Sequence, residues 1–495
     1  MPTKTRITRL ARFMLALMAL PLIGGWYFSL WSRLELAESP ANPRNVPRPE
    51  FRGALRDRAG RLLANSKGRR RVYPRGAAFA SFLGYFDVRL GSSAVEAYFD
   101  QQLQGRQRPG DLVDGAGVAP LQRVMGPDVV LTIDSQLQEL SYQLLQGSRG
   151  SVTLLHVPTG DVLAAASSPS YDPSRLGDAW DDLRKDPREP LFHRGLAGLY
   201  SPGSTFKVLT MLAALEEKVS SPGSILYCSG GLPMGDFTMT DSSGGGHGAL
   251  SLEDALVHSC NVIYGGLGLK LGVPKIEKWM DRTKLLLASD TLPGMFPGLA
   301  PGKDRSEVVT AQTAIGQGQF LVTPAAMARL AALVARRGLD IPPRVYRAEQ
   351  RGSRYFLSPP APARRLVSAE SAEAVAKALR GVVERGTGGA AQIPGLTVAG
   401  KTGTAENPRG EPDAWFIAFC PADKPMFAIC VMLENRGYGG TYAAPIAAKV
   451  LKAAMNSPIA KVGKSVKAKS SKKAKAPAKP RPNPTPMRSP EREAK

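Results

Sequence analysis

The 495-residue sequence predicts an α+β domain built on an antiparallel sheet and carried behind one N-terminal membrane helix. Three observations support this fold class. Residues 13–31 contain no charge, residues 135–168 follow a helical pattern and then a hairpin pattern, and residues 397–434 hold three apolar runs separated by turn residues. The chain also exceeds the usual size of one domain, so we expect a smaller appendage beside the main unit.

The N-terminal segment has the length and the charge pattern of a membrane anchor. Residues 13–31 form an uncharged run of 19 residues, which is about the length that a helix needs to cross the bilayer core. Residues 1–12 hold four basic side chains and no acid, whereas Glu35 and Glu38 follow the run. This charge difference places residues 1–12 in the cytoplasm and the chain after Trp31 outside. We therefore expect a single-pass protein of the cytoplasmic (inner) membrane, with its main domain periplasmic or otherwise extracytoplasmic.

A cleaved signal peptide is the competing interpretation of this segment. The apolar part of a signal peptide usually spans only about 7 to 15 residues and ends in small residues at the cleavage site. Here the run is longer and ends in aromatic residues, which suit the interface of a membrane. The sequence therefore favours an uncleaved anchor.

Composition divides the rest of the chain into four parts. Residues 32–50 carry the proline-rich stretch SPANPRNVPRP and predict a stiff linker. Residues 51–127 are rich in arginine, have only short apolar runs and predict a small pedestal domain. Residues 128–456 contain the long apolar patterns of the main domain. Residues 457–495 are mostly Lys, Ala, Pro and Ser, and they predict a disordered basic tail.

The main domain begins with strand, helix and hairpin patterns in that order. VVLTI at 129–133 is β-branched and predicts a strand, and SQLQELSYQLLQG at 135–147 places its leucines on one helical face. SVTLLHV and VLAAASS then flank a Pro-Thr-Gly-Asp turn and predict a hairpin. Near the end of the domain, TVAGKTGTAE, AWFIAFC and FAICVMLE predict three consecutive antiparallel strands.

A large share of the formal net charge of +23 lies in the short C-terminal tail. Residues 461–495 hold 12 Lys or Arg against 2 Asp or Glu, so they supply +10 and the remainder only +13. No zinc-ligand spacing, RNP-type aromatic motif or basic heptad pattern accompanies this charge, so specific nucleic-acid binding is not expected. The tail is either a solvated extension or a segment attracted to anionic polymers or lipid head groups.

Four cysteines in a chain of this length do not make a disulfide framework. They are most simply small buried apolar residues, and the sequence leaves open whether any of them pair. They are Cys228, Cys260, Cys420 and Cys430.

The first motif with residues suited to catalysis is STFK, in which Ser204 and Lys207 lie three positions apart. A serine hydroxyl needs a base within hydrogen-bond reach, and positions i and i+3 of a helix share a face. Lys207 is the only charge between positions 205 and 215, so we expect a buried helix and a lysine pKa lowered toward the neutral form. The turn residues at 201–203 place Ser204 at a helix N-terminus. By itself, S-x-x-K also arises by chance on helix surfaces.

The second motif, Ser259-Cys260-Asn261, begins 55 residues after Ser204 and follows a predicted short helix. We expect it on the loop after that helix. The hydroxyl of Ser259 can relay a proton, and the amide of Asn261 can bond both Lys207 and a substrate amide. Taken alone, this triplet also describes ordinary turns.

The third motif, KTGT at 401–404, begins a predicted strand 142 residues beyond Ser259. Its glycines allow a close backbone approach on a sheet edge, and its cation and hydroxyls suit a terminal carboxylate. We expect Lys401 to stay charged at this edge while Lys207 is neutral. K-T-G alone also fits a β-turn.

Together and in this order, the three motifs match the set found in penicillin-binding proteins and class A β-lactamases, with Ser-Cys-Asn in place of Ser-Asp-Asn. The chain resembles the class B penicillin-binding proteins, the monofunctional transpeptidases of cell-wall synthesis, from about residue 52 to residue 455. The Arg-Gly and Asp-Arg-x-Gly elements within 52–60, and segments such as PTGDVLA, GHGALSLEDAL, AIGQGQFLVTP and ERGTGGAA, look like segments of that family. The short 51–127 region resembles its small-pedestal forms.

The resemblance implies a transpeptidase domain with an antiparallel sheet and helices on both faces. It also implies a peptidoglycan D,D-transpeptidase that cross-links stem peptides and is acylated by β-lactam antibiotics. In that role Ser204 is the nucleophile, Lys207 the base, and Ser259 with Asn261 the proton relay. The residues implied to bind substrate are Lys401, Thr402, Gly403 and Thr404, and the backbone N–H groups of Ser204 and Thr404 form the oxyanion hole. No metal or organic cofactor is implied, and the implied partner is a membrane-embedded glycan polymerase of the SEDS type.

Other function classes stay open beside this one. A D,D-carboxypeptidase or a β-lactamase has the same fold and uses water instead of an amine, but the anchor and pedestal argue against a lactamase. A β-lactam sensor or an inactive scaffold is a binding module, but intact Ser204, Lys207 and Lys401 argue against inactivity.

Two departures bear on the resemblance, and the more important is that the region between the anchor and the main domain is much shorter than in large class B members. His193-Arg194-Gly195 stands where the family has Asn-Arg-Ala, and we expect this change to be tolerated. His247 follows a glycine run and lacks a paired acid in the sequence, so we expect it to position a loop. Cys260 has no base in any motif, so a thiol mechanism is not expected.

Overall fold

The computed structural model describes residues 52–68, 70–104, 126–241, 244–407 and 410–465, together with five isolated positions between 14 and 27. The predicted linker, nearly all of the predicted anchor and residues 466–495 of the predicted tail therefore lie outside the described residues. Within the part of the chain that is described, no helix combines the length and the hydropathy that a membrane span requires.

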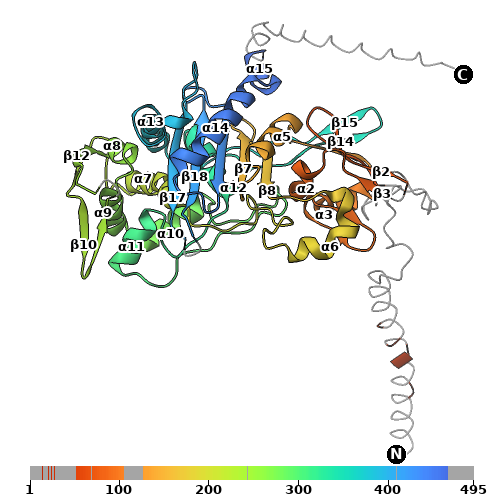
Figure 1. Ribbon diagram of the computed structural model, residues 1–495, viewed down its shortest axis with the longest axis horizontal. Coiled ribbons are helices and arrows are strands. Elements are labelled where there is room, and N and C mark those ends of the chain that lie inside the picture. Colours follow the sequence, from red (N-terminus) through yellow and green to blue (C-terminus); the bar gives the residue numbers. More distant parts are fainter. Residues whose placement is uncertain are drawn as a thin grey trace, which may run out of the picture.

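The centre of the molecule is a five-stranded sheet with the order β17-β18-β19-β7-β8. Every neighbouring pair is antiparallel, which confirms the predicted sheet, its hairpin and its three late strands (Figure 1). The strands are β7 (Gly150–His156), β8 (Val162–Ser168), β17 (Ala399–Ala405), β18 (Asp413–Cys420) and β19 (Phe427–Leu433).

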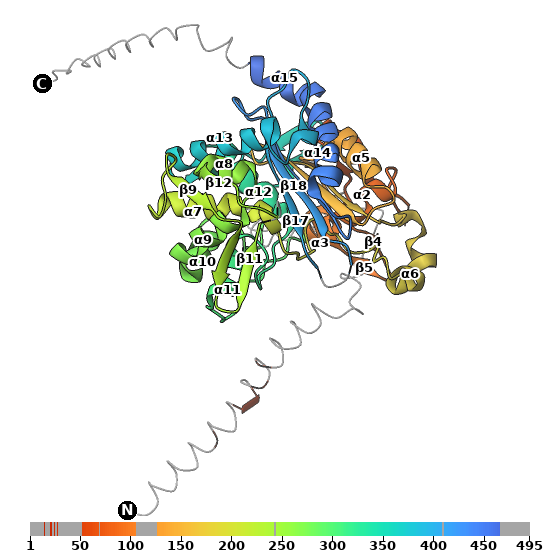
Figure 2. The same ribbon diagram turned by 60° about the vertical axis from the view of Figure 1, so that its left-hand side comes forward.

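Apolar residues of these strands alternate between two cores. Phe416 and Ala418 of β18 pack in a cluster with residues of α5 (Ser135–Leu144) and α14 (Gly439–Asn456). Trp415 and Ile417 pack in the other cluster, with residues of α12 (Pro324–Ala335), a helix that is buried along its whole length. A strand with a period of two gives this alternation when both faces of its sheet are covered, and Figures 1 and 2 show the covering helices.

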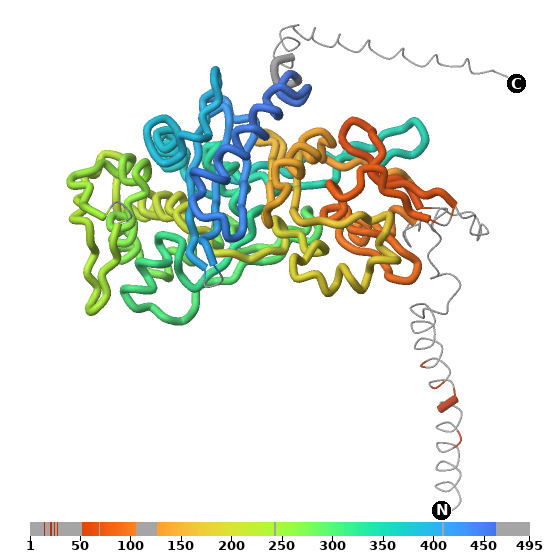
Figure 3. The backbone as a smooth tube through the Cα atoms, viewed as in Figure 1, coloured from red at the N-terminus to blue at the C-terminus, as the bar shows by residue number. Residues whose placement is uncertain are grey.

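A second sheet joins the N-terminal segment to the main domain. Its order is β15-β14-β6-β1-β2-β3, with β1 (Leu55–Arg56) parallel to β6 (Asp128–Leu131). The hairpin of β14 (Tyr346–Arg351) and β15 (Arg354–Leu357) extends the other side of β6, and Figure 3 shows it beside the N-terminal segment. The predicted pedestal therefore shares a sheet with strands of the main domain. Its other elements are β2 (Leu62–Lys67), β3 (Arg70–Val72), α2 (Ala77–Leu83), β4 (Phe86–Asp87), β5 (Gly91–Ser92), α3 (Ala94–Tyr98) and α4 (Asp100–Leu103).

Buried polar residues fix this N-terminal segment in place. Arg52 donates to Glu96 Oε2 at 2.8 Å, and Arg71 donates to Glu96 Oε1 at 2.7 Å. Ser135, at the start of α5, donates to Asp57 Oδ2 at 2.6 Å. Buried charges are tolerated when they are paired and hydrogen-bonded in this way. The sequence elements of 52–60 thus form part of the joint between the N-terminal segment and the main domain.

The remaining elements lie mostly around the β17 edge of the central sheet. The β10–β11 hairpin and the antiparallel pair β9–β12, whose strands flank it in the sequence, lie at the far end of this group. The elements are η3 (Pro173–Arg175), α6 (Leu176–Lys185), η4 (Gly203–Phe206), α7 (Lys207–Glu216), β9 (Ile225–Cys228), β10 (Gly231–Met234), β11 (Phe237–Thr240), β12 (Gly248–Ser251), α8 (Leu252–Val257), α9 (Asn261–Leu271), α10 (Val273–Arg282), α11 (Glu307–Ala314), β13 (Leu339–Asp340), β16 (Arg364–Arg365), α13 (Ala369–Arg385) and η5 (Gly389–Ala391).

The start of the predicted disordered tail is helical instead. After α14 the chain continues into α15 (Pro458–Ser465), and Ile459 is buried against the cluster that also holds residues of α14. The prediction that the chain is disordered from residue 457 was therefore wrong for the eight residues of α15. The physical reason is that Ile459 packs against the apolar cluster of the folded domain.

Candidate active site

Ser204 lies in a tight turn at the start of a buried helix. The 3-10 turn η4 carries Ser204 and leads directly into α7, which begins at Lys207. Gly203 has a φ of +53°, and a Cβ at this position would lie 2.7 Å from Thr404 O. Only glycine fits such a backbone and such a close approach. The turn therefore packs directly against β17, and Ser204 stays partly exposed between buried neighbours.

Lys207 is fully buried one turn after Ser204. Its Nζ donates to Ser259 O and to Asn261 Oδ1, each at 2.6 Å, and lies 3.3 Å from Ser259 Oγ. Burial lowers the pKa of Lys207 to about 7, in the direction that the sequence predicts. A neutral amine has two donors and one lone pair. Because the two oxygens take the donors, the lone pair stays free to accept a proton.

Ser259 connects α8 to α9 with a backbone that L-residues seldom adopt. Its φ is +59°, in the left-handed region that costs a residue with a side chain about 1 to 2 kcal/mol. Cys260 caps α9 and Asn261 is the first residue of that helix, so the motif spans a helix start rather than lying wholly on a loop as predicted. Such strain persists where the surrounding structure enforces it, often at functional sites.

Lys401 reaches the same hydroxyl from β17. Its Nζ donates to Ser259 Oγ at 2.9 Å and to Thr402 O at 3.1 Å. β17 is an edge strand as predicted, yet Lys401 is fully buried because η4 and α13 pack against the strand. Burial lowers the pKa of Lys401 well below its usual value, and the nearby Lys207 lowers it further. The sequence predicts a charged Lys401, whereas the burial seen in the structure favours its neutral form.

The rest of KTGT faces the nucleophile turn or is held by a neighbouring loop. A Cβ at Gly403 would lie 2.8 Å from Thr205 Cγ2, so glycine is needed where β17 meets the turn. Thr402 Oγ1 lies 2.7 Å from Thr387 Oγ1, a partner that sequence reasoning did not single out although it belongs to the segment ERGTGGAA. Thr404 is half-buried.

A partly buried ion network includes residues of the segment that leads to the Ser204 turn. Arg194 Nε and Tyr200 Oη donate to Glu434 Oε1 at 2.8 and 2.7 Å, and Arg149 Nε donates to Glu434 Oε2 at 2.5 Å. Burial opposes ionisation of Glu434, but these partners outweigh it and lower the pKa of Glu434. His193, the departure noted in the sequence, is buried beside this network with Nε2 3.1 Å from Ala165 O. Glu434 carries no motif signal, because its partners are far apart in the sequence.

His247 has an acidic neighbour after all. Its Nδ1 lies 3.4 Å from Asp241 Oδ2, so the expectation that His247 lacks a paired acid is wrong. Cys228 and Cys260 lie at the same place, and the ligand atoms of these four residues are all within 4.8 Å of one another. Spacings of 13, 6 and 13 positions between the four residues do not match a common metal-binding motif, so the sequence alone did not indicate a metal site. This group could hold a metal ion.

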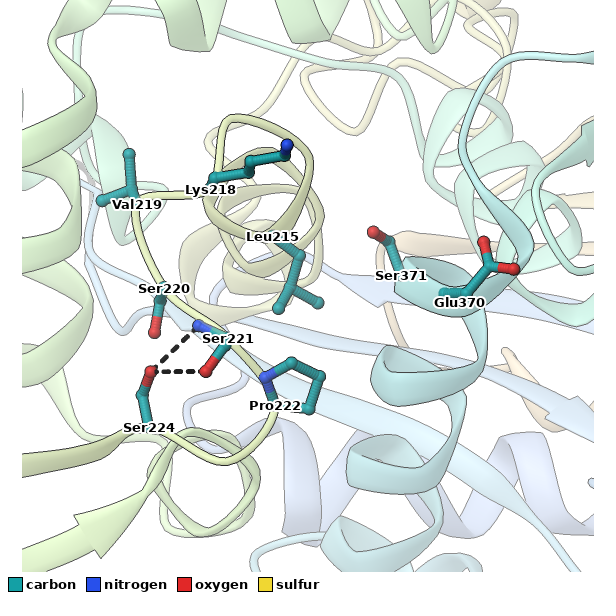
Figure 4. A pocket seen from close by; sticks show the side chains of 9 residues that line it. All are labelled: Leu215, Lys218, Val219, Ser220, Ser221, Pro222, Ser224, Glu370 and Ser371. Atoms are coloured by element: carbon teal, nitrogen blue, oxygen red, sulfur yellow. Dashed lines mark hydrogen bonds between the residues drawn. The ribbon is translucent and has the colours of Figure 1, made fainter.

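A surface pocket of about 490 Å³ lies away from these residues. It is formed by the end of α7, the loop that follows and the first turn of α13, and its lining includes Lys218 and Glu370 (Figure 4). It contains none of the predicted site residues. The lysine, serine and asparagine cluster around Ser259 is the chemically organised site, because buried amines and strained backbone coincide there.

The family comparison matches residues 150–452 to the model described as the penicillin binding protein transpeptidase domain. This range covers more than half of the chain and includes all eight predicted site residues.

Individual relatives give the same result. The chain is 32% identical to the peptidoglycan D,D-transpeptidase PbpA of Mycolicibacterium smegmatis, over 91% of this chain and 99% of that protein. It is 28% identical to the peptidoglycan D,D-transpeptidase MrdA of Acinetobacter baumannii, over 75% of this chain and 64% of that protein. Among solved structures, penicillin-binding protein A from Mycobacterium tuberculosis, as its penicillin G acyl-enzyme complex, superimposes with a TM-score of 0.73. That match has 30% identity and covers 82% of this chain and 99% of that one.

Proposed function

The chain belongs to the penicillin-binding protein transpeptidase family, and we propose that it is a peptidoglycan D,D-transpeptidase with Ser204 as its nucleophile. The observation that carries the proposal is that residues of three motifs, far apart in the sequence, lie together around the hydroxyl of Ser259. Lys207 and Lys401 approach Ser259 Oγ to 3.3 and 2.9 Å, and Ser204 lies on the turn just before Lys207. Relatives named as D,D-transpeptidases support the choice of reaction.

Acylation begins with proton transfer from Ser204 to the neutral amine of Lys207. As the proton leaves, Ser204 Oγ forms a bond to the carbonyl carbon between two D-alanines of a stem peptide. The carbonyl oxygen becomes negative and is stabilised by the backbone N–H groups of Ser204 and Thr404. Losing one donor of this kind typically costs about 3 to 4 kcal/mol of transition-state stabilisation.

Release of the terminal D-alanine needs a proton on its nitrogen. Ser259 donates its hydroxyl proton to that nitrogen and receives one from the Lys207 ammonium, 3.3 Å away. The C–N bond breaks, D-alanine leaves, and Lys207 is again neutral. Asn261 holds Lys207 in position through its 2.6 Å bond.

The second half of the reaction repeats these steps in reverse. The amine of a neighbouring stem peptide attacks the ester carbonyl, gives up a proton through Ser259 to Lys207, and displaces Ser204 Oγ, which takes a proton back. When the substrate is a β-lactam, Ser204 attacks the amide carbonyl of the lactam ring in the acylation half of the reaction, and the ring C–N bond breaks. Its leaving nitrogen stays tethered, so the acyl-enzyme persists and the enzyme is inhibited.

Lys401, Thr402, Gly403 and Thr404 bind the terminal carboxylate of the donor peptide. In the free protein burial lowers the pKa of Lys401, and an incoming carboxylate favours the ammonium form again. The substrate therefore completes its own charge pair on binding. A water molecule in place of the carboxylate carries no charge, so it would not form this charge pair with Lys401.

The topology expected from the sequence places this reaction outside the cytoplasm. An anchor at 13–31 keeps the catalytic domain on the extracytoplasmic face of the membrane, where stem peptides are cross-linked. A SEDS-type glycan polymerase in the same membrane is the proposed partner, since it supplies the strands to be linked.

Penicillin labelling tests the proposed nucleophile. Ser204→Ala abolishes covalent labelling by fluorescent penicillin while the circular dichroism spectrum is unchanged, because one oxygen atom is lost. Ser201→Ala, a partly exposed serine of the same loop, is the matched control and labels like the wild type. Mass spectrometry that finds the adduct on Ser201 or Ser259 would overturn the assignment. Product analysis with an acceptor amine separates transfer from hydrolysis, and hydrolysis alone would indicate a carboxypeptidase.

A further inference from the structure

Two hairpins of the six-stranded sheet end in positively charged tips. Lys67 pairs with Arg70 across the β2–β3 turn, and Arg351 pairs with Arg354 across the β14–β15 turn. All four side chains are exposed. Arg351 forms an ion pair with Glu349, whereas the other three cations have no ion-pair partner in the part of the chain that the structure describes. These three charges can therefore meet an external anion.

Both tips project past the same end of the sheet. β14 is antiparallel to β6 and finishes beside Asp128, the first residue of β6. β1 is parallel to β6, and β2 is antiparallel to β1. The end at which β1 and β6 begin is therefore the end at which β2 and β14 finish. In Figure 3 the two tips, orange-red and cyan, both point toward the right-hand side.

The chain enters the sheet at this same end. The folded part begins at Arg52, three residues before β1, and the linker of residues 32–50 and the anchor expected at residues 13–31 precede it. A proline-rich chain extends by about 3.1 Å per residue, so the 19 linker residues reach about 60 Å. Given the anchored topology of the proposed function, the tips are tethered close to a bilayer.

Large apolar side chains lie next to one of the tips. Tyr355, Phe356 and Leu357 of β15 are 54%, 53% and 73% exposed, and β15 is an edge strand of its sheet. Arg351 lies over the Phe356 ring, 5.8 Å from its centre. Arginines favour phosphate oxygens, and aromatic residues favour the interface between water and the acyl chains of a bilayer. The β14–β15 tip thus combines two kinds of side chain that a lipid surface attracts.

We propose that the β2–β3 and β14–β15 tips dock on the anionic phospholipid head groups of the membrane that holds the anchor. Lys67, Arg70 and Arg354 meet lipid phosphates, and the apolar residues of β15 enter the interface. Each Lys or Arg near an anionic surface strengthens binding by about fivefold. The tether raises the effective concentration of the lipid surface, so contacts that are weak singly are occupied.

Docking would set the orientation of the catalytic site. An anchor joined by a linker restricts distance but not orientation, whereas two tips on one sheet add two further points of attachment. The sheet continues into the main domain through β6, and Leu55 of β1 shares an apolar cluster with residues of α12. The Ser204 site therefore keeps one height and one direction above the membrane surface.

Lipid proximity in nanodiscs tests the proposal. The full-length chain carries a fluorescent label on Ser353→Cys, in the β14–β15 turn, or on Ser221→Cys, an exposed residue after α7 that serves as the control. The native cysteines are buried, so the label reacts with the introduced thiol. In nanodiscs rich in phosphatidylglycerol, a quencher on the lipid head groups should quench the label at 353 at least about threefold more than the label at 221.

Matched double substitutions separate charge at the tips from charge in general. Lys67→Gln with Arg354→Gln removes two tip charges and should reduce the quenching at 353 to the control level. Lys270→Gln with Lys303→Gln removes two exposed charges elsewhere and should leave that quenching unchanged. Nanodiscs of phosphatidylcholine alone should weaken it as well. The basic C-terminal tail is present in every variant, so it does not cause these differences.

Three results would overturn the proposal. Quenching at 353 that does not exceed quenching at 221 in anionic nanodiscs does so, and it leaves the tips to a protein partner. Equal quenching in the two double variants does so because charge at the tips would then play no part. A chain that does not enter nanodiscs does so because the tips would have no tether. Penicillin labelling of Ser204 is measured on the same samples, so failure of the proposed reaction and failure of docking are told apart.

Discussion

At the residue scale, two lysine side chains contact the same hydroxyl, that of Ser259. Lys207 and Lys401 are both fully buried, and both reach Ser259 Oγ. Two ammonium groups that both lie within 3.3 Å of one oxygen repel each other, and burial removes solvation from each. The state in which both lysines are charged is therefore disfavoured. Burial therefore lowers the pKa of both amines, which is the direction that a general base requires.

The acid limb of the acylation profile follows from Lys207. Burial lowers the pKa of Lys207 to about 7, and only its unprotonated form accepts the Ser204 proton. The second-order rate of penicillin acylation should therefore fall as pH drops through about 7. Lys207→Arg keeps a cation that does not deprotonate in proteins and should slow acylation by about 10² to 10⁴-fold. An acid limb that persists unaltered in Lys207→Arg would show that another group is the base.

Ser259 combines a chemical role with a strained backbone, and the two can be separated. Ser259→Gly and Ser259→Ala both lose the hydroxyl, so both should lose acylation to the same degree. They differ at the backbone, because φ is +59° and glycine adopts this region without a steric penalty. Ser259→Gly should therefore be more stable than Ser259→Ala by about 1 kcal/mol in chemical denaturation. Equal stabilities would mean that position 259 is not strained.

At the scale of elements, the segment before the nucleophile turn is anchored by Glu434 at the end of β19. Tyr200 is half-buried and donates to Glu434 at 2.7 Å, and a hydrogen bond to a charged group contributes about 1.5 to 3 kcal/mol. Tyr200→Phe should lower the free energy of unfolding by about this amount and slow acylation modestly, because the loop that carries Ser204 is loosened. Tyr355→Phe alters a tyrosine that is 54% exposed on β15 and should change stability by less than about 0.5 kcal/mol. Equal losses in the two variants would contradict this role of Glu434.

Elements with local signals were predicted from the sequence, and elements with non-local partners were not. The hairpin β7–β8 and the strands β17, β18 and β19 are recognisable in the sequence as apolar runs between turn residues. Their order in the sheet, with β19 next to β7, joins segments that are far apart in the chain. The β10–β11 hairpin and the β9–β12 pair consist of four-residue strands whose side chains are mostly exposed or half-buried, so no regular apolar alternation marks them.

The same division holds for the site. Ser204 and Lys207 fall on one helical turn, so their proximity and the burial of Lys207 follow from local pattern. Burial of Lys401 depends on what covers the sheet edge, which the sequence does not reveal. The cluster of Cys228, Asp241, His247 and Cys260 was not predicted, because its members meet only when the β9–β12 strand pair and the β10–β11 hairpin pack against α9.

At the scale of the whole molecule, the boundary predicted at residues 127 and 128 crosses a continuous sheet. β1 lies parallel to β6, so a main strand takes its neighbour from the N-terminal segment. Leu55, Phe79 and Phe82 of that segment belong to the same apolar cluster as residues of α12 and β18. The predicted pedestal and the main domain therefore form one cooperative unit rather than two modules joined by a linker.

This continuity predicts that the transpeptidase region does not fold when cut at its predicted boundary. A chain of residues 128–465 leaves β6 without β1 and exposes the side of the core that Phe79 and Phe82 cover, and each buried phenylalanine contributes about 1.5 to 3 kcal/mol. Native domains have a margin of only about 5 to 15 kcal/mol, so losing several such side chains together unfolds them. The matched control is residues 52–465, which keeps both sheets and lacks the same tail. We expect the control to be soluble, to melt cooperatively and to label with penicillin, while the shorter chain aggregates. A soluble 128–465 chain that labels at the control rate would show that the N-terminal segment is an independent pedestal after all.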